Sequence, residues 1–281
     1  MNYLSEARIL VLEEIARQLR VESIRMIHRR GSGHPGGALS AAEILAVLYF
    51  DKMKHDPANP DWEERDRFFL SKGHASAALY AALAKCGYFP AEDLLSWGEH
   101  DCHLQGHPVR VKPPGIEMGA GPLGHGLAVG AGVAMAARLN MKRCRTYVLF
   151  GDGEMQAGII WEAANVASKY HLANLTAILD YNDVQLDGSV HDILPLEPVA
   201  DKWRAFNWHV IEINGHNIRQ VREALDLAEE VHSQPTIIIA HTTKGKGVSY
   251  MENNSKWHGS VPNAEQLEIA MRELSVKGGA K

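Results

Sequence analysis

The second half of the chain alternates short, wholly apolar segments with longer segments of helical periodicity. Tyr147-Val-Leu-Phe150 and Ile237-Ile-Ile239 are apolar throughout. Strands of this kind are buried on both faces, which is typical of a parallel sheet covered by helices on each side. The alternation therefore predicts an α/β fold with an open, mostly parallel sheet and helices on both faces.

The expected elements follow one another closely after residue 122. Helices are predicted at 123–140, 159–170, 197–206 and 217–232, and strands at 146–150, 175–179, 208–213 and 236–240. Earlier helices are predicted at 4–28, 75–86, 91–97 and, with Ser40 as its N-cap, from 41 to about 51. Residues 31–37, 55–66 and 98–122 are predicted loops. No repeat or flexible linker divides the chain, so residues 1–281 are expected to form one domain.

Composition excludes several classes of partner and location. The net charge of −5 gives no broad basic field, so nucleic acid is not an expected partner. Cys86, Cys102 and Cys144 lack CxxC spacing, which argues against a disulfide framework and favours a cytoplasmic location. Residues 118–137 lack acidic and basic side chains, but they hold six glycines and Pro122. We therefore expect a loop followed by a buried small-residue helix, and no membrane span.

Oxygen ligands follow two of the predicted strands at the point where each strand ends. Gly151-Asp152-Gly153 comes after one strand, and Asn182 and Val184 come after the next. Open parallel sheets bind ligands at this edge. Asp152, Asn182 and the Val184 carbonyl would suit Mg²⁺ or Ca²⁺ bound to a diphosphate, with Gly153 admitting a phosphate. A pair of capped turns without a ligand is the alternative.

Histidine is unusually frequent, with fifteen in the chain, several of them in glycine-rich loops. Such imidazoles can bind phosphate or transfer protons near neutral pH. A zinc site within 100–107 is not expected, because its histidines are too crowded for tetrahedral coordination. Gly119-Ala-Gly121-Pro-Leu-Gly124 matches a dinucleotide pattern in spacing only. It follows no strand and precedes no acidic ribose ligand, so NAD is not expected.

A series of motifs along the chain closely resembles the transketolase family. In order, the series comprises Gly33-His34-Pro35-Gly36, Ser71-Lys-Gly-His74, Gly106-His107-Pro108, Gly121-Pro122-Leu123-Gly124, Gly151-Asp152-Gly153, Asn182 to Gly188, Lys244-Gly-Lys-Gly247 and Trp257-His258-Gly259. The order and the approximate spacing match as well. The resemblance covers nearly the whole chain and implies a thiamine-diphosphate-binding fold of the diphosphate-binding type.

The resemblance also implies an activity and a set of site residues. The activity is transfer of a two-carbon ketol unit from a ketose to an aldose with thiamine diphosphate and Mg²⁺ or Ca²⁺. The implied metal ligands are Asp152, Asn182 and Val184. The implied cofactor-binding residues are His74, Gly121, Pro122, Leu123, Gly153, Glu162, Asn182, Leu186 and His258, with Leu123 and Leu186 flanking the thiazolium ring. The implied catalytic residues are His34, His74, His107 and His258.

The resemblance further implies a missing partner. Whole transketolases are more than twice this length, and the glutamate that activates the cofactor belongs to a pyrimidine-binding domain absent here. We therefore expect a separately encoded C-terminal subunit, in a heterotetramer of two copies of each chain. Ala157 replaces a glutamate of the family motif, whereas Glu162 keeps the second acidic position. Two alternatives stay open: the α subunit of a 2-oxoacid dehydrogenase, and a non-catalytic cofactor-binding regulatory subunit.

Overall fold

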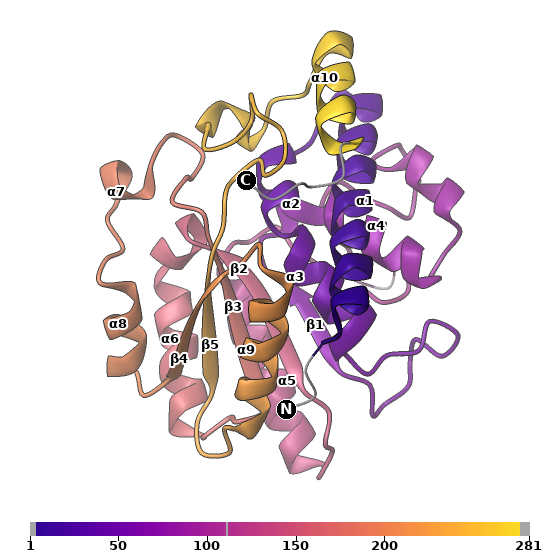
Figure 1. The fold of residues 1–281 in the computed structure, drawn as a ribbon. Coiled ribbons are helices and arrows are strands. Elements are labelled where there is room, and N and C mark those ends of the chain that lie inside the picture. The colour runs from indigo at the N-terminus through magenta and orange to yellow at the C-terminus, as the bar shows by residue number, and fades with distance from the viewer. Residues whose placement is uncertain (1–3, 111, 276–281) are drawn as a thin grey trace.

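A five-stranded parallel sheet forms the centre of the computed structural model, which describes residues 4–110 and 112–275 (Figure 1). The strands lie in the order β1-β2-β3-β5-β4. Their bounds are β1 Arg67–Leu70, β2 Thr146–Gly151, β3 Leu175–Tyr181, β4 His209–Asn214 and β5 Thr236–His241. All neighbouring strands pair in parallel, so the predicted fold class is confirmed.

Helices cover both faces of the sheet because side chains alternate along each strand. Tyr147 and Leu149 join one apolar cluster, and Val148 and Phe150 join the other. The first face is covered by α1 (Glu6–Arg30), α3 (Ala42–Val47), α4 (Ser76–Cys86) and α9 (Ile218–Glu230). The second face is covered by α5 (His125–Leu139), α6 (Gly158–Lys169) and α8 (Val199–Ala205).

Shorter helices occupy the connections between these elements. They are α2 (Pro35–Ser40), α7 (Val190–Ile193), a π-helical turn η1 (Leu48–Lys52) and the 3-10 turns η2 (Gly73–Ala75), η3 (Ala91–Ser96), η4 (Gly153–Gln156) and η5 (Ser255–His258). The last helix, α10 (Ala264–Ser275), packs against α1. Arg17 of α1 donates to the Leu274 carbonyl oxygen at 3.1 Å. The two ends of the described chain are therefore joined.

The structure corrects the prediction for residues 31–51. The helix begins at Pro35 rather than after Ser40, because proline at the first helical position has a favourable φ and needs no hydrogen-bond acceptor. Ser40 is not an N-cap. Its hydroxyl donates to the Asp180 carboxylate at 2.6 Å, inside the core. The short edge strand β1 was not predicted at all.

The glycine-rich segment around residue 130 forms the buried helix that was predicted. On α5, a Cβ added to Gly130 would lie 2.5 Å from a methyl group of Val148 in β2. The glycine therefore allows the helix to approach the sheet closely. Among the helices of residues 4–110 and 112–275, none is long and apolar enough to cross a bilayer.

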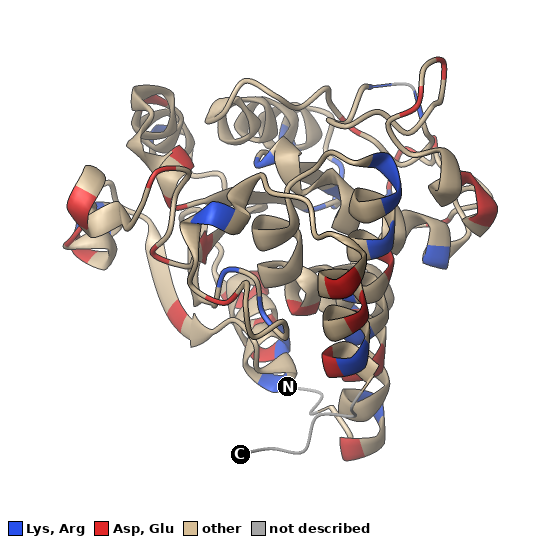
Figure 2. Cartoon of the chain, turned by 90° about the horizontal axis from the view of Figure 1, so that it is seen from above, with Lys and Arg blue, Asp and Glu red and all other residues tan. Residues whose placement is uncertain are grey.

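Acidic and basic residues are interspersed over the molecule (Figure 2). Several of them form a network that ties the start of the chain to α9. Asp51 accepts from Arg8 at 2.9 Å and from Arg222 at 2.7 Å, and Lys52 contacts Asp226 at 2.6 Å. These charges stabilise packing between helices and lie apart from the strand ends.

Candidate active site

The carboxyl ends of all five strands meet at one edge of the sheet. This edge presents residues 71–74 after β1, 152–156 after β2, 182–188 after β3, 214–217 after β4 and 242–247 after β5. The connections that follow parallel strands carry the functional groups in folds of this class. Most of the residues predicted from the sequence lie here.

The two predicted strand ends are joined through Asp152. Its carboxylate is buried and accepts from the backbone amides of Gly153 at 2.7 Å, Asn182 at 2.9 Å and Asp183 at 2.6 Å. The Asn182 side-chain oxygen accepts from the Val184 amide at 3.3 Å. The structure therefore brings the three predicted metal ligands together on adjacent strand ends.

Asp152 is a buried carboxylate in an environment that favours its neutral form. Burial, followed by the nearby Asp180, raises the pKa of Asp152 to about 6. A cation bound beside this carboxylate would oppose both effects. Carboxylate, amide and carbonyl oxygens are also the donors that Mg²⁺ and Ca²⁺ prefer, so the residues fit a hard divalent ion.

The four predicted catalytic histidines converge. The ring centroid of His34 lies 5.4 Å from that of His74, 5.9 Å from that of His107 and 5.4 Å from that of His258. The rings of His74 and His258 are 5.0 Å apart. His34 precedes α2, His74 follows β1, and His258 ends η5, so three distant segments form one cluster.

Burial keeps these rings uncharged near neutral pH. It lowers the pKa of His34, with His107 and Lys244 adding to the effect, and lowers the pKa of His74 further still. Burial, followed by Lys244, lowers the pKa of His258 to about 3. Neutral imidazoles can both accept and donate a proton, which suits proton exchange with a substrate.

Lys244 was named in a sequence motif but given no role, and the structure places it in the centre of the site. Its ammonium group donates to the Val184 carbonyl oxygen at 2.7 Å and lies 2.9 Å from Nδ1 of His258. Burial lowers the pKa of Lys244 to about 8, although Asp152 opposes this. Lys244 therefore links the predicted metal-binding turn to the histidine cluster.

A second buried charge pair supports the end of β3. Asp180 accepts from Lys72, from the Ser40 hydroxyl at 2.6 Å and from the Thr242 hydroxyl. Burial by itself would raise the pKa of Asp180, but Lys72 and these hydrogen bonds outweigh it and the pKa is lowered. Neither Lys72 nor Asp180 was predicted, because pairing across 108 residues leaves no local pattern.

Glu154 is a further residue that the sequence analysis missed. It is buried and accepts from the Gly124 amide at 2.6 Å, from the Gly151 amide at 3.2 Å and from the Ser71 hydroxyl. It thereby fixes the glycine-rich loop before α5 against β2. Its position directly after Gly151-Asp152-Gly153 is the one signal that pointed to it.

The predicted cofactor residues on the rim are only partly gathered. Gly121 and Pro122 are exposed in that loop, and Leu123 and Leu186 expose 45% and 59% of their surface. Glu162 lies on the exposed side of α6. No hydrogen bond or ion pair joins it to another residue in the described part of the chain. The structure therefore does not bring Glu162 into the cluster.

Two features near Gly153 fit an anionic group. A Cβ at Gly153 would lie 2.9 Å from Cβ of Gln185, so a side chain would not fit there and the backbone stays accessible. The Gln185 side-chain nitrogen is buried without a hydrogen-bond partner among the described residues. An orphaned donor beside a bare backbone turn suits a phosphate oxygen.

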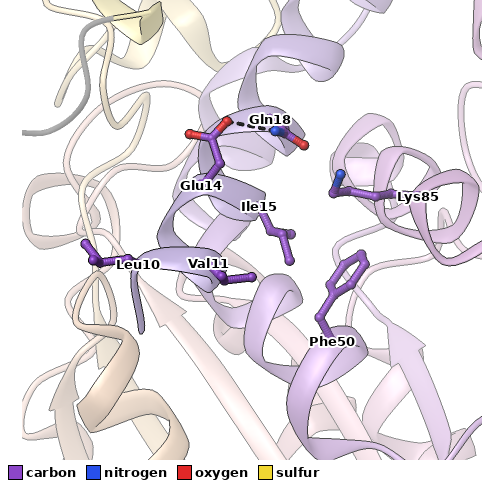
Figure 3. A pocket seen from close by; sticks show the side chains of 7 residues that line it. All are labelled: Leu10, Val11, Glu14, Ile15, Gln18, Phe50 and Lys85. Carbon is purple, nitrogen blue, oxygen red and sulfur yellow. Dashed lines mark hydrogen bonds between the residues drawn. The ribbon is translucent and has the colours of Figure 1, made fainter. Parts of the chain in front are cut away.

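Other histidines and a surface hollow lie apart from this cluster. His103 pairs with Asp93 at 3.0 Å, and exposed His100 lies beside Asp101. A hollow of about 480 Å³ lies along the outer side of α1, where Leu10, Val11 and Phe50 border it (Figure 3). Its polar groups do not include any residue predicted for the site, so we do not assign the chemistry to it.

Known proteins share this outline. Residues 11–279 match the family model described as "Transketolase, thiamine diphosphate binding domain". One of the two subunits of an apulose-4-phosphate transketolase from Phocaeicola vulgatus is 44% identical over 94% of this chain and 94% of its own length. The 6-deoxy-6-sulfo-D-fructose transketolase subunit SqwG of Clostridium sp. is 43% identical over 95% of this chain and 97% of its own length.

Solved structures agree with the fold and differ in extent. Transketolase from Leishmania mexicana superposes with a TM-score of 0.90 at 34% identity, and that from Campylobacter jejuni with 0.90 at 37%. The chain is covered to 94% in both, but it spans only 41% and 42% of those proteins. By family match, fold and site geometry together, the chain belongs to the transketolase family and comprises its N-terminal thiamine-diphosphate-binding domain.

Proposed function

We propose that the chain is the cofactor-binding subunit of a two-subunit transketolase, which transfers a two-carbon ketol unit from a ketose, or ketose phosphate, to an aldose. The convergence of His34, His74, His107 and His258 beside the Asp152 and Asn182 strand ends carries the proposal. A domain that served only to bind a diphosphate would have no need of four such rings. Residues 1–281 are proposed to act as one domain in the cytoplasm.

Each group in the site is assigned a task. Asp152, Asn182 and the Val184 carbonyl would hold Mg²⁺ or Ca²⁺, and Gly153, His74 and His258 would bind the diphosphate. Thiamine diphosphate, when bound, supplies the nucleophile and the electron sink for cleavage of the bond next to a ketose carbonyl. Leu123 and Leu186 would lie against its thiazolium ring. Gly121 and Pro122 would shape the same rim.

The hydrogen bonds define how the histidines handle protons. Lys244 donates to Nδ1 of His258, so this neutral ring carries its proton on Nε2 and can donate from there to a sugar oxygen. His34 and His107 would accept or return protons at the hydroxyl and carbonyl groups of the substrate. Glu162, which lies on the exposed side of α6, is proposed to contribute only in contact with a partner.

The partner is proposed to be a separate polypeptide with the pyrimidine-binding and C-terminal domains, in a complex of two copies of each chain. The exposed Leu123 and Leu186 and the names of the two relatives, each called a transketolase subunit, support this proposal. Both names also specify a sugar with an acidic group, so an anionic ketose is the donor that we would assay first.

The test is ketol transfer by the purified chain with and without the product of the adjacent gene. We expect transfer only with both chains, thiamine diphosphate and magnesium. Transfer by the isolated chain would refute the two-subunit model. Cofactor binding by the complex without transfer from any ketose would instead favour the regulatory alternative. The family match to transketolases already removes the 2-oxoacid dehydrogenase alternative.

A further inference from the structure

His216 lies between β4 and α9, outside every motif considered above, and its two ring nitrogens bind different elements. Nδ1 lies 3.0 Å from a carboxylate oxygen of Glu43, and Nε2 accepts from the Thr243 backbone amide at 2.8 Å. A backbone amide can only donate, so Nε2 carries no proton. Nδ1 therefore carries the proton and donates it to Glu43.

Glu43 is itself held rigidly. It is buried on α3 and accepts from Arg20 of α1 at 2.5 Å, while Arg20 also donates to the Leu39 carbonyl oxygen at 3.0 Å. Burial would raise the pKa of Glu43, but Arg20 and His216 outweigh it and lower the pKa to about 2. The orientation of the His216 ring is thus set by two core helices.

Thr243 stands in a segment whose neighbours contact the reaction centre on either side. Thr242 donates its hydroxyl to Asp180, and Lys244 donates to Val184 and contacts His258. Gly245 donates its amide to the Gly36 carbonyl oxygen at 3.0 Å. In the described chain the Thr243 amide has no acceptor other than His216. The ring is therefore the side-chain anchor at the middle of this segment.

We propose that His216, oriented by Glu43, is a positioning residue that holds residues 242–245 through the Thr243 amide and so sets the place of Lys244 against Val184 and His258. It touches neither substrate nor cofactor by this assignment. The inference deepens the proposed function and rests on it for its consequence, whereas the anchoring contact itself does not.

Two substitutions separate the two ring nitrogens. His216→Gln places an amide oxygen near the position of Nε2 and keeps an acceptor for Thr243. His216→Asn reaches only the position of Nδ1, so it keeps a donor for Glu43 and leaves the Thr243 amide without an acceptor. His171→Asn is the control, because His171 binds the Ser233 carbonyl oxygen at 3.0 Å at the opposite edge of the sheet.

Two measurements on the full chain decide the matter. The first is amide hydrogen exchange of residues 242–247, which needs no ligand, and the second is the Kd for thiamine diphosphate with Mg²⁺ by calorimetry. For His216→Asn we expect both exchange and Kd to rise on the order of tenfold, and for His216→Gln and His171→Asn to change by less than about threefold. Equal Kd values for the Asn and Gln variants would overturn the inference.

Failure of the proposed function is distinguishable from failure of this inference. If the unsubstituted chain binds no thiamine diphosphate, the proposed function fails. Exchange then decides the inference: faster exchange at both 242–247 and 255–259 in His216→Asn supports positioning of Lys244 and His258. An effect confined to the Thr243 amide, or none, contradicts it.

Discussion

At the scale of single residues, the site is built from buried charges that compensate one another. Lys72 and Asp180 are both almost inaccessible to water, and Asp152 lies near Lys244 in a similar environment. A buried ion is costly unless a partner and hydrogen bonds replace its hydration. Each of these groups therefore depends on its neighbours for both its charge and its place.

The first prediction concerns the proposed metal ligand. Asp152→Asn removes the charge and keeps the shape, so the affinity for thiamine diphosphate should fall at least about tenfold and lose its dependence on magnesium. Calorimetric titration with and without magnesium measures both effects. Asp187→Asn, an exposed carboxylate on the same turn, is the control. Unchanged affinity and magnesium dependence in the Asp152 variant would exclude the assignment.

The second prediction concerns Glu43 and acid stability. Its pKa is lowered from 4.5 to about 2 in the folded chain, so its contribution is complete above pH 4.5 and is lost as the pH falls to about 2. The loss is about 3 kcal/mol of unfolding free energy. Urea unfolding at pH 7 and pH 3 should therefore show a smaller acid loss for Glu43→Gln than for the unsubstituted chain.

The control for that experiment is Glu22→Gln on α1, the helix that also carries Arg20. Glu22 is a partly exposed residue that pairs with Arg25 at 2.8 Å. Exposed pairs of this kind contribute little to stability. An acid loss in Glu43→Gln as large as that of the Glu22→Gln chain would show that the Glu43 pairing does not contribute as expected.

Sequence position predicted some of these residues and not others. Asp152 and Asn182 were found because adjacent strand ends must meet, which is a consequence of sheet geometry. Lys244 and His216 were not assigned, because their partners are defined only by the folded chain: Val184 lies 60 residues from Lys244, and Glu43 lies 173 residues from His216. Pairing of this kind has no periodicity to detect.

At the scale of elements, long periodic segments were predicted well and short ones were not. The helices after residue 122 and four of the strands were found within a few residues of their bounds. Strand β1 has only four residues, beginning with Arg67, and lies at the edge of the sheet. Glycine and proline before α2 indicated a loop, although proline also begins helices. Local composition alone does not distinguish the two.

The third prediction compares two glycines on α5. Gly130→Ala places a methyl group 2.5 Å from Val148, whereas a Cβ at Gly132 meets no atom within 4 Å. We expect Gly130→Ala to lower the unfolding free energy by about 1–3 kcal/mol through overpacking. Gly132→Ala should raise it by about 0.5–1 kcal/mol through helix propensity. Urea unfolding measures both, and equal effects would contradict the close approach of helix and sheet.

At the scale of the whole molecule, the site draws on segments from nearly the full chain. His34, His107 and His258 come from three such regions, and they face an edge whose rim exposes Leu123 and Leu186. Exposed apolar groups at the mouth of a buried polar cluster are typical of a binding surface. This arrangement is the structural reason for expecting a second polypeptide over the rim.

The fourth prediction concerns the contact between the first and last helices. Leu274 of α10 is buried in a cluster with Ile24 of α1 and Trp257, so Leu274→Ala should lower the unfolding free energy by about 2–4 kcal/mol. Leu139→Ala is the matched control, because Leu139 is 79% exposed and should change it by less than about 0.5 kcal/mol. Urea unfolding would show similar midpoints for the two variants if the cluster contributed nothing.

The same cluster bears on how the protein is made. Ile24 and Leu39 pack with Val248, Met251 and Leu274, so an apolar surface near the beginning of the chain finds its partners only near the end. During translation the nascent first helix must therefore wait, with that surface uncovered, until the last helix has left the ribosome. Chaperones have this interval in which to bind it.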